Sequence, residues 1–381
     1  MKQLVILGST GSIGRQTLEV VRSLSGDFRV LGLAGGRNTG LLSRQVAEFG
    51  PRFVCYQGGG AKPPGERVSL EELACSPEAD IVMVATSGSV GLAPTLAAIR
   101  AGKAVALANK EVLVMAGEVV MAQARLHRAR IMPVDSEHSA IWQCLRGEGR
   151  GSGRRGARIF LTASGGPFRS RSREELARVT PREALDHPTW KMGKKVTIDS
   201  ATLMNKGMEA IEAHWFFDIP WEDIQVLIHP ESIVHSLVEF PDGSVKAQLA
   251  APDMRLPIQY ALTYPRRRSN PGLPRLDLAR LGALHFEAPD LERFPCLRLA
   301  LEAGRAGGTC PAVLSAADEV AVELFEDRHI GFLGIPRLVE KVLEGHDPIP
   351  HPNLEDIMSV DAWARDKARD LVSSEGSTWQ P

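Results

Sequence analysis

The chain has few of the features that mark several large classes of protein. Its 381 residues include only five cysteines, which are widely spaced and form no C-x-x-C pair. This predicts reduced thiols in a cytoplasmic protein and not a disulfide framework. The formal net charge is -1, so the chain offers no broad basic field to nucleic acid. No apolar run reaches the roughly 18 residues of a membrane span, and we expect neither a nucleic-acid nor a membrane partner.

Tyrosine is also scarce, and its positions exclude one class of oxidoreductase. The three tyrosines are Tyr56, Tyr260 and Tyr264, and none has a lysine four residues later. Short-chain dehydrogenases need a Tyr-x-x-x-Lys motif, so that class is excluded. The apolar stretch Leu4–Leu7 begins almost at the first residue, and we expect no signal or transit peptide before it.

Hydrophobic runs predict an α/β protein whose first part is a doubly wound, Rossmann-like parallel sheet. Short apolar runs recur at intervals of about 25 residues, with helix-like segments between them. This alternation is typical of a parallel sheet with helices on its faces. The six runs are Leu4–Leu7, Val30–Ala34, Phe53–Tyr56, Ile81–Ala85, Ala104–Ala108 and Ile131–Val134.

Composition shifts predict three domains. We expect an α/β domain over 1–149, an α+β domain over 150–274, a linker over 275–292 and a small helical bundle over 293–381. The stretch Gly147–Gly156 is rich in Gly and Arg and marks the first boundary as a flexible loop. Ile233–Phe240 and Val245–Ala251 flank a Pro-Asp-Gly-Ser turn and predict an antiparallel hairpin. The tail after Val372 is expected to be frayed.

A glycine-rich turn joins the first expected strand to the first expected helix. Gly8, Gly11 and Gly14 are spaced G-x-x-G-x-x-G. Glycine there lets the backbone approach a pyrophosphate, and the helix N-terminus supplies N–H donors. The spacing differs from the usual G-x-G-x-x-G, so the turn indicates a dinucleotide or nucleotide-sugar enzyme without deciding which. A plain strand-to-helix turn is the alternative.

The second expected strand indicates which cofactor is bound. It ends in Gly35-Gly36-Arg37-Asn38, where an NAD enzyme generally places an acidic residue against the ribose. An arginine can hold a 2′-phosphate through two hydrogen bonds, which favours NADPH over NADH. The alternative is an ordinary solvated arginine.

Polar residues also follow the fifth and sixth expected strands, where the carboxyl ends of a parallel sheet open onto a ligand crevice. Asn109-Lys110-Glu111 suit contact with nicotinamide and substrate, although a helix first turn explains Glu111 equally well. Asp135 and Glu137 are two residues apart, so on a strand they share a face and converge on one ion. Oxygen ligands indicate Mg2+ or Mn2+, and a solvated strand end is the alternative.

A helix expected to start near Ser200 places Asn205, Lys206 and Glu209 on one face. These residues can complete a metal site and present an amine to a phosphate. Glu212 falls on nearly the same face, so geometry alone leaves the choice of glutamate open. A surface salt bridge between Lys206 and Glu209 is the alternative.

Two further segments suit a phosphorylated substrate. Ser164-Gly165-Gly166 follows an expected strand and offers a hydroxyl in a glycine-rich turn. The loop His187–Gly193 carries Trp190 and Met192 between proline and glycine and suits a lid that excludes water. The alternative is a tryptophan half buried in the core.

These motifs together resemble the 1-deoxy-D-xylulose 5-phosphate reductoisomerase family, and the resemblance covers essentially the full length. The run from His187 through Glu209 is the most specific part. The other matching strings are Gly8–Gly14, Ala108–Glu111, Pro133–His138, Ala163–Phe168, His229–His235 and Ala317–Val322. The chain departs from the pattern at Ser315 and Asp318, where asparagines are expected.

The resemblance implies metal-assisted rearrangement of 1-deoxy-D-xylulose 5-phosphate and reduction by NADPH to 2-C-methyl-D-erythritol 4-phosphate, in non-mevalonate isoprenoid precursor biosynthesis. It also implies a homodimer. The implied NADPH contacts are Thr10, Gly11, Ser12, Ile13, Gly36, Arg37, Asn38, Asn109, Glu111 and Gly193. The implied metal ligands are Asp135, Glu137 and Glu209, which with Lys110 form the catalytic set. The implied substrate contacts are Lys110, Ser136, Glu137, Ser164, His187, Ser200, Asn205, Lys206 and Glu209, with Ser164, Ser200, Asn205 and Lys206 nearest the phosphate.

Two other functions compete with this one. Semialdehyde and homoserine dehydrogenases also join a nucleotide domain to an α+β domain, but their chemistry does not explain three convergent carboxylates. A redox sensor without catalytic activity would bind NADPH and show no metal-dependent turnover.

Overall fold

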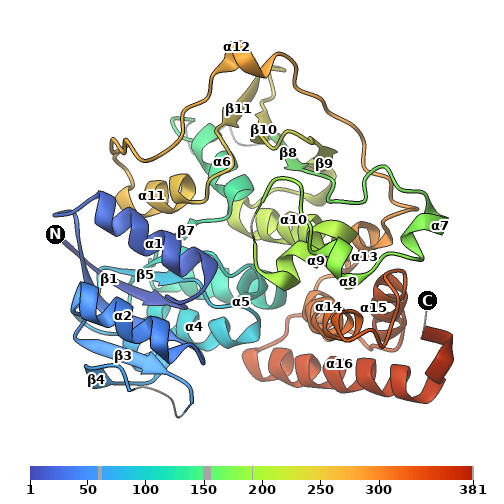
Figure 1. The fold of residues 1–381 in the computed structure, drawn as a ribbon, viewed down its shortest axis with the longest axis horizontal. Coiled ribbons are helices and arrows are strands. Elements are labelled where there is room, and N and C mark those ends of the chain that lie inside the picture. The colour runs from blue at the N-terminus through green and yellow to red at the C-terminus, as the bar shows by residue number, and fades with distance from the viewer. Residues whose placement is uncertain (59–61, 149–155, 191, 380–381) are drawn as a thin grey trace. The chain divides into compact units, whose positions relative to one another are not determined.

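The computed structural model describes residues 1–58, 62–148, 156–190 and 192–379. Residues 149–155 of the expected boundary loop and Lys191 of the expected lid lie outside the described residues. The chain forms two compact units, and Figure 1 labels the elements of both. The first unit is Met1–Val112, Val120–Trp142 and Asp253–Leu276, and the second is Leu113–Val119, Gln143–Pro252 and Asp277–Pro381.

The first unit contains the expected doubly wound parallel sheet, which confirms the fold class. Its strands are β1 (Lys2–Leu7), β2 (Phe28–Gly35), β3 (Phe53–Tyr56), β4 (Glu66–Arg67), β5 (Ile81–Val84), β6 (Ala104–Leu107) and β7 (Ile131–Pro133). They lie in the order β4-β3-β2-β1-β5-β6-β7, and every paired neighbour is parallel. The chain order reverses between β1 and β5, which is where such sheets bind ligands beyond the carboxyl ends of the strands.

Helices cover both faces of this sheet, since Leu4–Leu7 of β1 have no exposed surface although they alternate in direction. The helices placed wholly or partly in this unit are α1 (Ser12–Ser23), α2 (Thr39–Phe49), α3 (Leu70–Ala74), α4 (Leu92–Arg100), α5 (Glu111–Leu126), α6 (Ser136–Cys144) and α11 (Arg255–Thr263), with a 3-10 turn at η1 (Ser89–Gly91).

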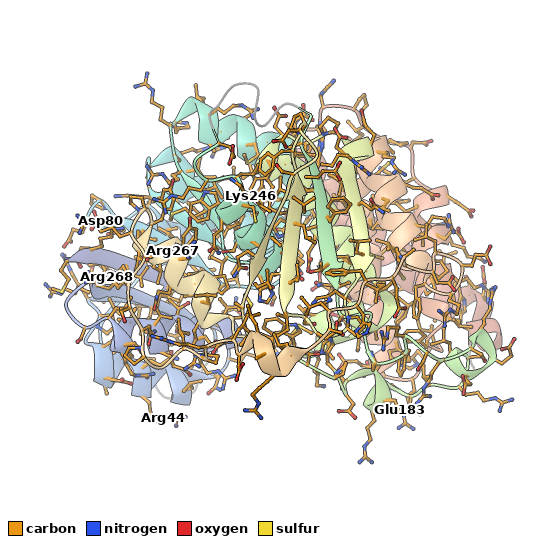
Figure 2. The ribbon with its side chains drawn as sticks, turned by 90° about the horizontal axis from the view of Figure 1, so that it is seen from above. Arg44, Asp80, Glu183, Lys246, Arg267 and Arg268 are labelled. Atoms are coloured by element: carbon orange, nitrogen blue, oxygen red, sulfur yellow. The ribbon has the colours of Figure 1, made fainter. Side chains whose placement is uncertain are left out.

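Helix α11 belongs to the first unit, although its residues fall in the segment expected to form the second domain. It packs against α1, and Lys2 Nζ donates to the carbonyl oxygen of Leu262 at 3.2 Å. Arg267 and Arg268 follow in the next connector (Figure 2). The Arg268 guanidinium makes two 2.8 Å hydrogen bonds to Asp27. The bonds from Arg268 attach the connector to Asp27, directly before β2 of the parallel sheet.

The second unit is built on a mixed sheet in the order β11-β10-β8-β9. Its strands are β8 (Arg158–Ala163), β9 (Ile224–Ile228), β10 (Val234–Glu239) and β11 (Val245–Leu249). The expected hairpin is confirmed, because β10 and β11 pair antiparallel and Gly243 adopts a φ of 82° in the turn. Between β8 and the C-terminal helices, this unit contains α7 (Arg173–Leu176), α8 (Pro181–Ala184), α9 (Lys194–Thr202), α10 (Met204–Phe217) and α12 (Leu278–Leu281), with a 3-10 turn at η2 (Trp221–Asp223).

The expected C-terminal helices are present as α13 (Pro295–Ala306), α14 (Cys310–Glu326), α15 (Gly334–Glu344) and α16 (Leu354–Glu375), followed by η3 (Gly376–Trp379). Helix α14 packs against the other three. The expectation of a frayed tail is wrong. Trp379 is 2% exposed, its carbonyl oxygen accepts from Gly331 N at 3.0 Å, and the Arg337 guanidinium lies 4.4 Å from its ring centre.

The helix expected to start near Ser200 is two helices. Helix α9 ends at Thr202, Leu203 adopts a left-handed φ of 63°, and α10 begins at Met204. The Thr202 hydroxyl explains the break, since it donates to the Asp199 carbonyl at 3.2 Å and accepts from Met204 N at 3.3 Å. Such local bonds compete with the helical ladder. Of the helices in the described ranges, none is both long and apolar enough to cross a membrane.

Candidate active site

Two positions of the glycine turn after β1 leave no room for a side chain. Gly8 has a φ of 88°, and a Cβ there would lie 2.4 Å from the Ala85 carbonyl oxygen. A Cβ at Gly14 would lie 2.2 Å from the carbonyl oxygen of Gly8. The turn therefore passes directly against β5 and into α1, which begins at Ser12. Thr10–Ile13 sit at that helix N-terminus, where free N–H groups favour an anion.

The end of β2 lies beside this turn, because a Cβ at Gly35 would be 3.1 Å from Thr10 Cγ2. Asn38 caps α2 through its Oδ1, which accepts from Leu41 N at 3.1 Å. Arg37 is exposed. No side chain in the described ranges makes an ion pair with its guanidinium. The predicted arginine is thus available to an anion beside the glycine turn. The side-chain oxygen of Asn38 already accepts the capping hydrogen bond, and its NH2 group remains as a donor.

Asn109-Lys110-Glu111 link the end of β6 to α5. Asn109 is 1% exposed, and its amide donates to the Gly88 carbonyl at 3.0 Å and to Thr86 Oγ1 at 3.2 Å. Glu111 is the first residue of α5, so the helix-turn explanation holds for its position. Lys110 Nζ donates to Asp135 Oδ2 at 2.8 Å. The carboxyl ends of β6 and β7 therefore bring their polar side chains together, as the parallel sheet predicts.

The two carboxylates after β7 are not on a strand, so the argument from a shared strand face is wrong. Strand β7 ends at Pro133, and Glu137 lies in the first turn of α6, which begins at Ser136. The start of α6 brings Asp135 and Glu137 together in a different way, through Ser136. Ser136 N donates to Asp135 Oδ1 at 2.8 Å, and Ser136 Oγ donates to Glu137 Oε2 at 2.5 Å. The short helical turn keeps both carboxylates within reach of one serine.

In the second unit a histidine joins two serines from separate elements. His187 Nε2 lies 3.0 Å from Ser164 Oγ, just after β8, and 3.1 Å from Ser200 Oγ on α9. The Gly165-Gly166 turn makes this approach possible, since a Cβ at Gly166 would lie 2.7 Å from the Ser200 carbonyl oxygen. The sequence named all three residues, and the structure shows that they form one hydrogen-bonded group.

The same histidine also orders the expected lid. His187 Nδ1 accepts from Trp190 N at 2.8 Å and from Thr189 N at 3.1 Å. An accepting Nδ1 places the ring proton on Nε2, which then donates to a serine hydroxyl. Burial lowers the pKa of His187 below its usual value and favours this neutral form. The group can therefore offer hydroxyl hydrogens and an N–H to an anion.

Trp190 has an intermediate exposure, and its ring centre lies 6.1 Å from that of His235. The alternative of a half-buried tryptophan therefore agrees with its burial, and the lid stays a prediction. Met192 is also partly exposed, and Gly193 caps the start of α9.

The face of α10 that carries Asn205, Lys206 and Glu209 is buried. Lys206 is 3% and Glu209 1% exposed, and the two form an ion pair. Asn205 Nδ2 donates to Glu209 Oε1 at 2.5 Å. The alternative of a surface salt bridge is therefore wrong. Withdrawing an ion pair from water costs free energy, and titratable groups in such surroundings cluster at functional sites. Glu212 is also buried, at 2% exposure.

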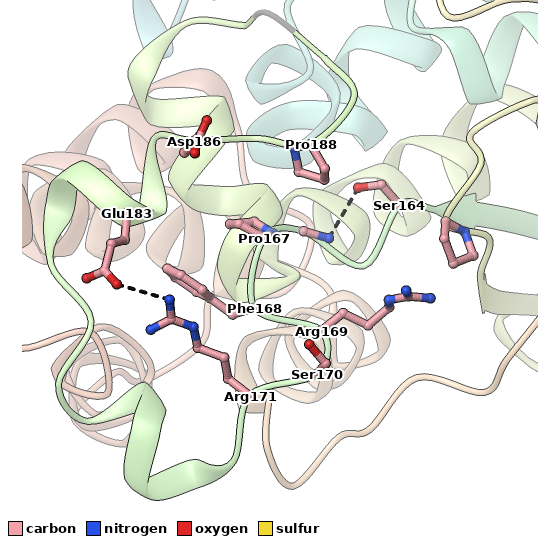
Figure 3. Close-up of a pocket in the computed structure, with 11 residues that line it drawn as sticks. Ser164, Pro167, Phe168, Arg169, Ser170, Arg171, Glu183, Asp186 and Pro188 are labelled. Carbon is pink, nitrogen blue, oxygen red and sulfur yellow. Dashed lines mark hydrogen bonds and ion pairs between the residues drawn. The ribbon is translucent and has the colours of Figure 1, made fainter.

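A cavity of about 430 Å3 opens beside Ser164 in the second unit, within the size range of small-molecule sites. Figure 3 shows Pro188 and Ser164 on one side of it and Arg171, paired with Glu183 at 3.0 Å, on the other. Its lining residues are Ser164, Gly166, Pro167, Phe168, Arg169, Ser170, Arg171, Glu183, Asp186, Pro188 and Pro230. Six of them lie in segments that the sequence analysis named, and the others are Arg169, Ser170, Arg171, Glu183 and Asp186. The sequence signal for these five was the pair of arginines after the glycine turn.

Models of one enzyme family match most of the chain. Residues 4–63 and 64–117 match a family model described as 1-deoxy-D-xylulose 5-phosphate reductoisomerase. Residues 131–217 match the C-terminal domain model of that enzyme, and residues 249–367 match a model described as the DXP reductoisomerase C-terminal domain.

Relatives resemble the chain over nearly all of its length. The 1-deoxy-D-xylulose 5-phosphate reductoisomerase of Heliobacterium modesticaldum is 55% identical, covering 98% of each chain. That of Geobacillus kaustophilus is 52% identical, covering 98% of this chain and 100% of the relative.

Solved structures agree with the described fold. The Zymomonas mobilis enzyme in complex with NADPH superposes with a TM-score of 0.89 at 43% identity, covering 98% of this chain and 99% of that one. A DOX-P reductoisomerase in complex with NADPH, fosmidomycin and magnesium superposes with a TM-score of 0.92 at 39% identity, covering 99% and 100%.

Proposed function

The chain belongs to the 1-deoxy-D-xylulose 5-phosphate reductoisomerase family, and from this we infer which of its residues carry out the reaction. It is an NADP-dependent oxidoreductase that rearranges 1-deoxy-D-xylulose 5-phosphate and reduces the product to 2-C-methyl-D-erythritol 4-phosphate, in isoprenoid precursor biosynthesis. Family membership rules out the semialdehyde and homoserine dehydrogenases as alternatives. The assignment of individual residues below is our proposal.

The residues around the glycine turn fit a dinucleotide phosphate. Gly8 and Gly14 leave no room for a Cβ, so the turn packs closely against β5 and against its own backbone. The N–H groups of Thr10–Ile13 at the N-terminus of α1 would hold the pyrophosphate. Arg37 would hold the 2′-phosphate, with Gly36 and the amide nitrogen of Asn38 beside it. Asn109, Glu111 and Gly193 complete the proposed NADPH contacts. Asn109 would act mainly by its backbone, because its side-chain NH2 donates to Thr86 and Gly88 and its Oδ1 accepts from Val112 N at 3.3 Å.

The carboxylates fit a hard divalent cation. Asp135 pairs with Lys110 at 2.8 Å and is 19% exposed in its side chain, which is compatible with an ionised oxygen ligand. We propose Asp135, Glu137 and Glu209 as metal ligands, with Mg2+ and Mn2+ both acceptable. A bound cation would polarise the substrate carbonyl and stabilise developing oxyanion charge, while NADPH supplies the hydride. Lys110 would hold Asp135 in place, and Ser136 would orient Glu137.

The hydrogen-bonded group Ser164, His187 and Ser200 is the observation that carries the proposal for substrate binding. Both hydroxyl oxygens lie within 3.1 Å of His187 Nε2, and the hydroxyl groups can rotate toward phosphate oxygens. Buried Lys206 supplies a positive charge, and Asn205 an amide donor. Closure of the loop with Trp190 and Met192 would exclude water from a phosphate bound there.

Substrate-dependent oxidation of NADPH tests the function directly. We expect NADPH absorbance to fall only when 1-deoxy-D-xylulose 5-phosphate and Mg2+ or Mn2+ are both present, with product identification by mass spectrometry. Addition of EDTA should stop the reaction, and excess metal should restore it. A protein that binds NADPH but never turns over with metal present would instead be a redox sensor.

Quaternary structure, location and domain division are also proposed. We propose a homodimer, and sedimentation of a 41.4 kDa species at micromolar concentration would argue against it. All five cysteines are free thiols, which supports a cytoplasmic location. The functional division into 1–149, 150–274, a 275–292 linker and 293–381 also stays a proposal, which limited proteolysis would test by the positions of the first cuts.

A further inference from the structure

Lys195 in the first turn of α9 is held between two buried carboxylates. Its Nζ lies 2.6 Å from Asp199 Oδ2, one turn further along α9, and 2.8 Å from Asp318 Oδ2 on α14. Asp199 is 1% and Asp318 0% exposed. Lys195 Nζ also lies 3.8 Å from Met208 Sδ on α10. The ammonium group therefore joins α9 to a helix of the C-terminal group.

The neighbouring lysine makes a similar link at the surface. Lys194 Nζ lies 3.0 Å from Glu326 Oε1, also on α14, but the Lys194 side chain is 73% exposed. Exposed ion pairs contribute about 0–1 kcal/mol. A partner removed from a buried pair leaves an uncompensated charge, which is far more costly. The two lysines thus provide a buried link and a matched exposed control between the same two helices.

Helix α9 carries both Lys195 of this link and Ser200 of the proposed phosphate site. Gly193, directly before the two lysines, ends the expected lid, and Ser200 in the same helix lies 3.1 Å from His187 Nε2. Because a helix is rigid over one to two turns, a shift of its first turn moves Ser200 relative to Ser164 and His187. Helix α14 is a firm support, since 13 of its 17 residues are buried.

Asp318 is also one of the two positions where the chain departs from the family pattern. The structure gives the departure a role, because a carboxylate there meets the ammonium group of Lys195. An asparagine would still offer an acceptor oxygen at the same place, without the charge.

We propose that the Lys195–Asp318 contact makes the C-terminal helices part of the substrate site, by fixing the position of Ser200 on α9. Lys195 and Asp318 are positioning residues and touch no substrate. The proposal rests on the substrate site proposed above.

The test compares Asp318→Ala, Asp318→Asn and Lys194→Met with the wild-type enzyme. Asp318→Ala removes the acceptor and should raise the KM for 1-deoxy-D-xylulose 5-phosphate by about tenfold, with a smaller fall in kcat. Asp318→Asn keeps an acceptor and should restore KM to within about twofold, and Lys194→Met should stay in the same range. Lys195→Met breaks the contact from the other side and also removes the ion pair with Asp199, so its effect on KM should be at least as large as that of Asp318→Ala.

Each outcome decides the matter. A folded Asp318→Ala or Lys195→Met enzyme with unchanged KM overturns the proposal, and so does Lys194→Met raising KM as much as Lys195→Met. If neither Asp318→Ala nor Lys195→Met folds, the contact is needed for the fold as a whole and the positioning role is refuted. A wild-type enzyme without metal-dependent turnover would refute the proposed function, whereas an active wild type with insensitive variants refutes only this inference.

Discussion

The close approach of α10 and α13 gives the sharpest test of how the buried face of α10 is held. Gly207 lies between Lys206 and Met208, and a Cβ there would be 2.3 Å from the Cβ of Ala300 on α13. Carbon atoms pack at about 3.5–4.0 Å, so an alanine at position 207 must push the two helices apart by more than about 1 Å. The next atoms, Ala300 Cα and the Cys296 carbonyl oxygen, are 3.7 Å away and present no clash.

Gly207→Ala should therefore be destabilising although alanine is the better helix former. Overpacking of a core typically costs about 1–3 kcal/mol, while the gain in helix propensity is at most about 1 kcal/mol. Because Asn205, Lys206 and Glu209 lie on the displaced helix, kcat/KM should fall as well. Calorimetric melting and steady-state kinetics on the same preparation measure both effects.

A compensating variant tests whether the Cβ of Ala300 causes the loss of stability. Ala300→Gly alone should cost about 1 kcal/mol in helix propensity, yet it removes the one clashing atom. The double variant Gly207→Ala/Ala300→Gly only moves a methyl group from α13 to α10, so its stability and kcat/KM should return close to wild type. Gly40→Ala on α2 is the control, because nothing lies within 4 Å of that added Cβ.

Two results would refute this account. A Gly207→Ala enzyme as stable as the wild type would show that the helices adjust without cost. A double variant no better than the sum of the single ones would show that Ala300 is not the atom that sets the distance.

Three further outcomes are expected. Arg37→Asp should weaken NADPH binding by about 1.5–3 kcal/mol more than NADH binding, and equal losses in a fluorescence titration would contradict the 2′-phosphate contact. Trp190→Ala should lower kcat/KM at least about tenfold with little change in melting temperature; a large fall in melting temperature with unchanged kcat/KM would argue for a core role. Burial lowers the pKa of His187 below the usual value of 6.5. The contribution of neutral His187 to folding stability is therefore complete above pH 6.5 and is lost as the pH falls through the lowered pKa. The melting temperature should therefore fall on the acid side, and His187→Asn, which keeps an acceptor but does not titrate, should flatten that part of the profile of melting temperature against pH.

The sequence determined those features that depend on neighbouring residues. The strands β1, β2, β3, β5, β6 and β7 coincide with short apolar runs, because strands buried on both faces leave a local hydrophobic signature. Gly8 and Gly14 were recognisable as a turn, because only glycine tolerates their backbone geometry and close contacts. The hairpin β10–β11 was recognisable from its turn residues in the same way.

Tertiary structure decided the features that depend on residues far apart in the chain. Periodicity placed Lys206 and Glu209 on one face but could not tell surface from core, because their burial depends on packing that includes α13 at Gly207. Glu137 was expected on a strand and lies in a helix, since β7 ends at Pro133. The contact of Lys195 with Asp318 and the packing of Trp379 against Arg337 join distant segments. Such contacts arise from the packing of whole helices, which no local pattern of residues records.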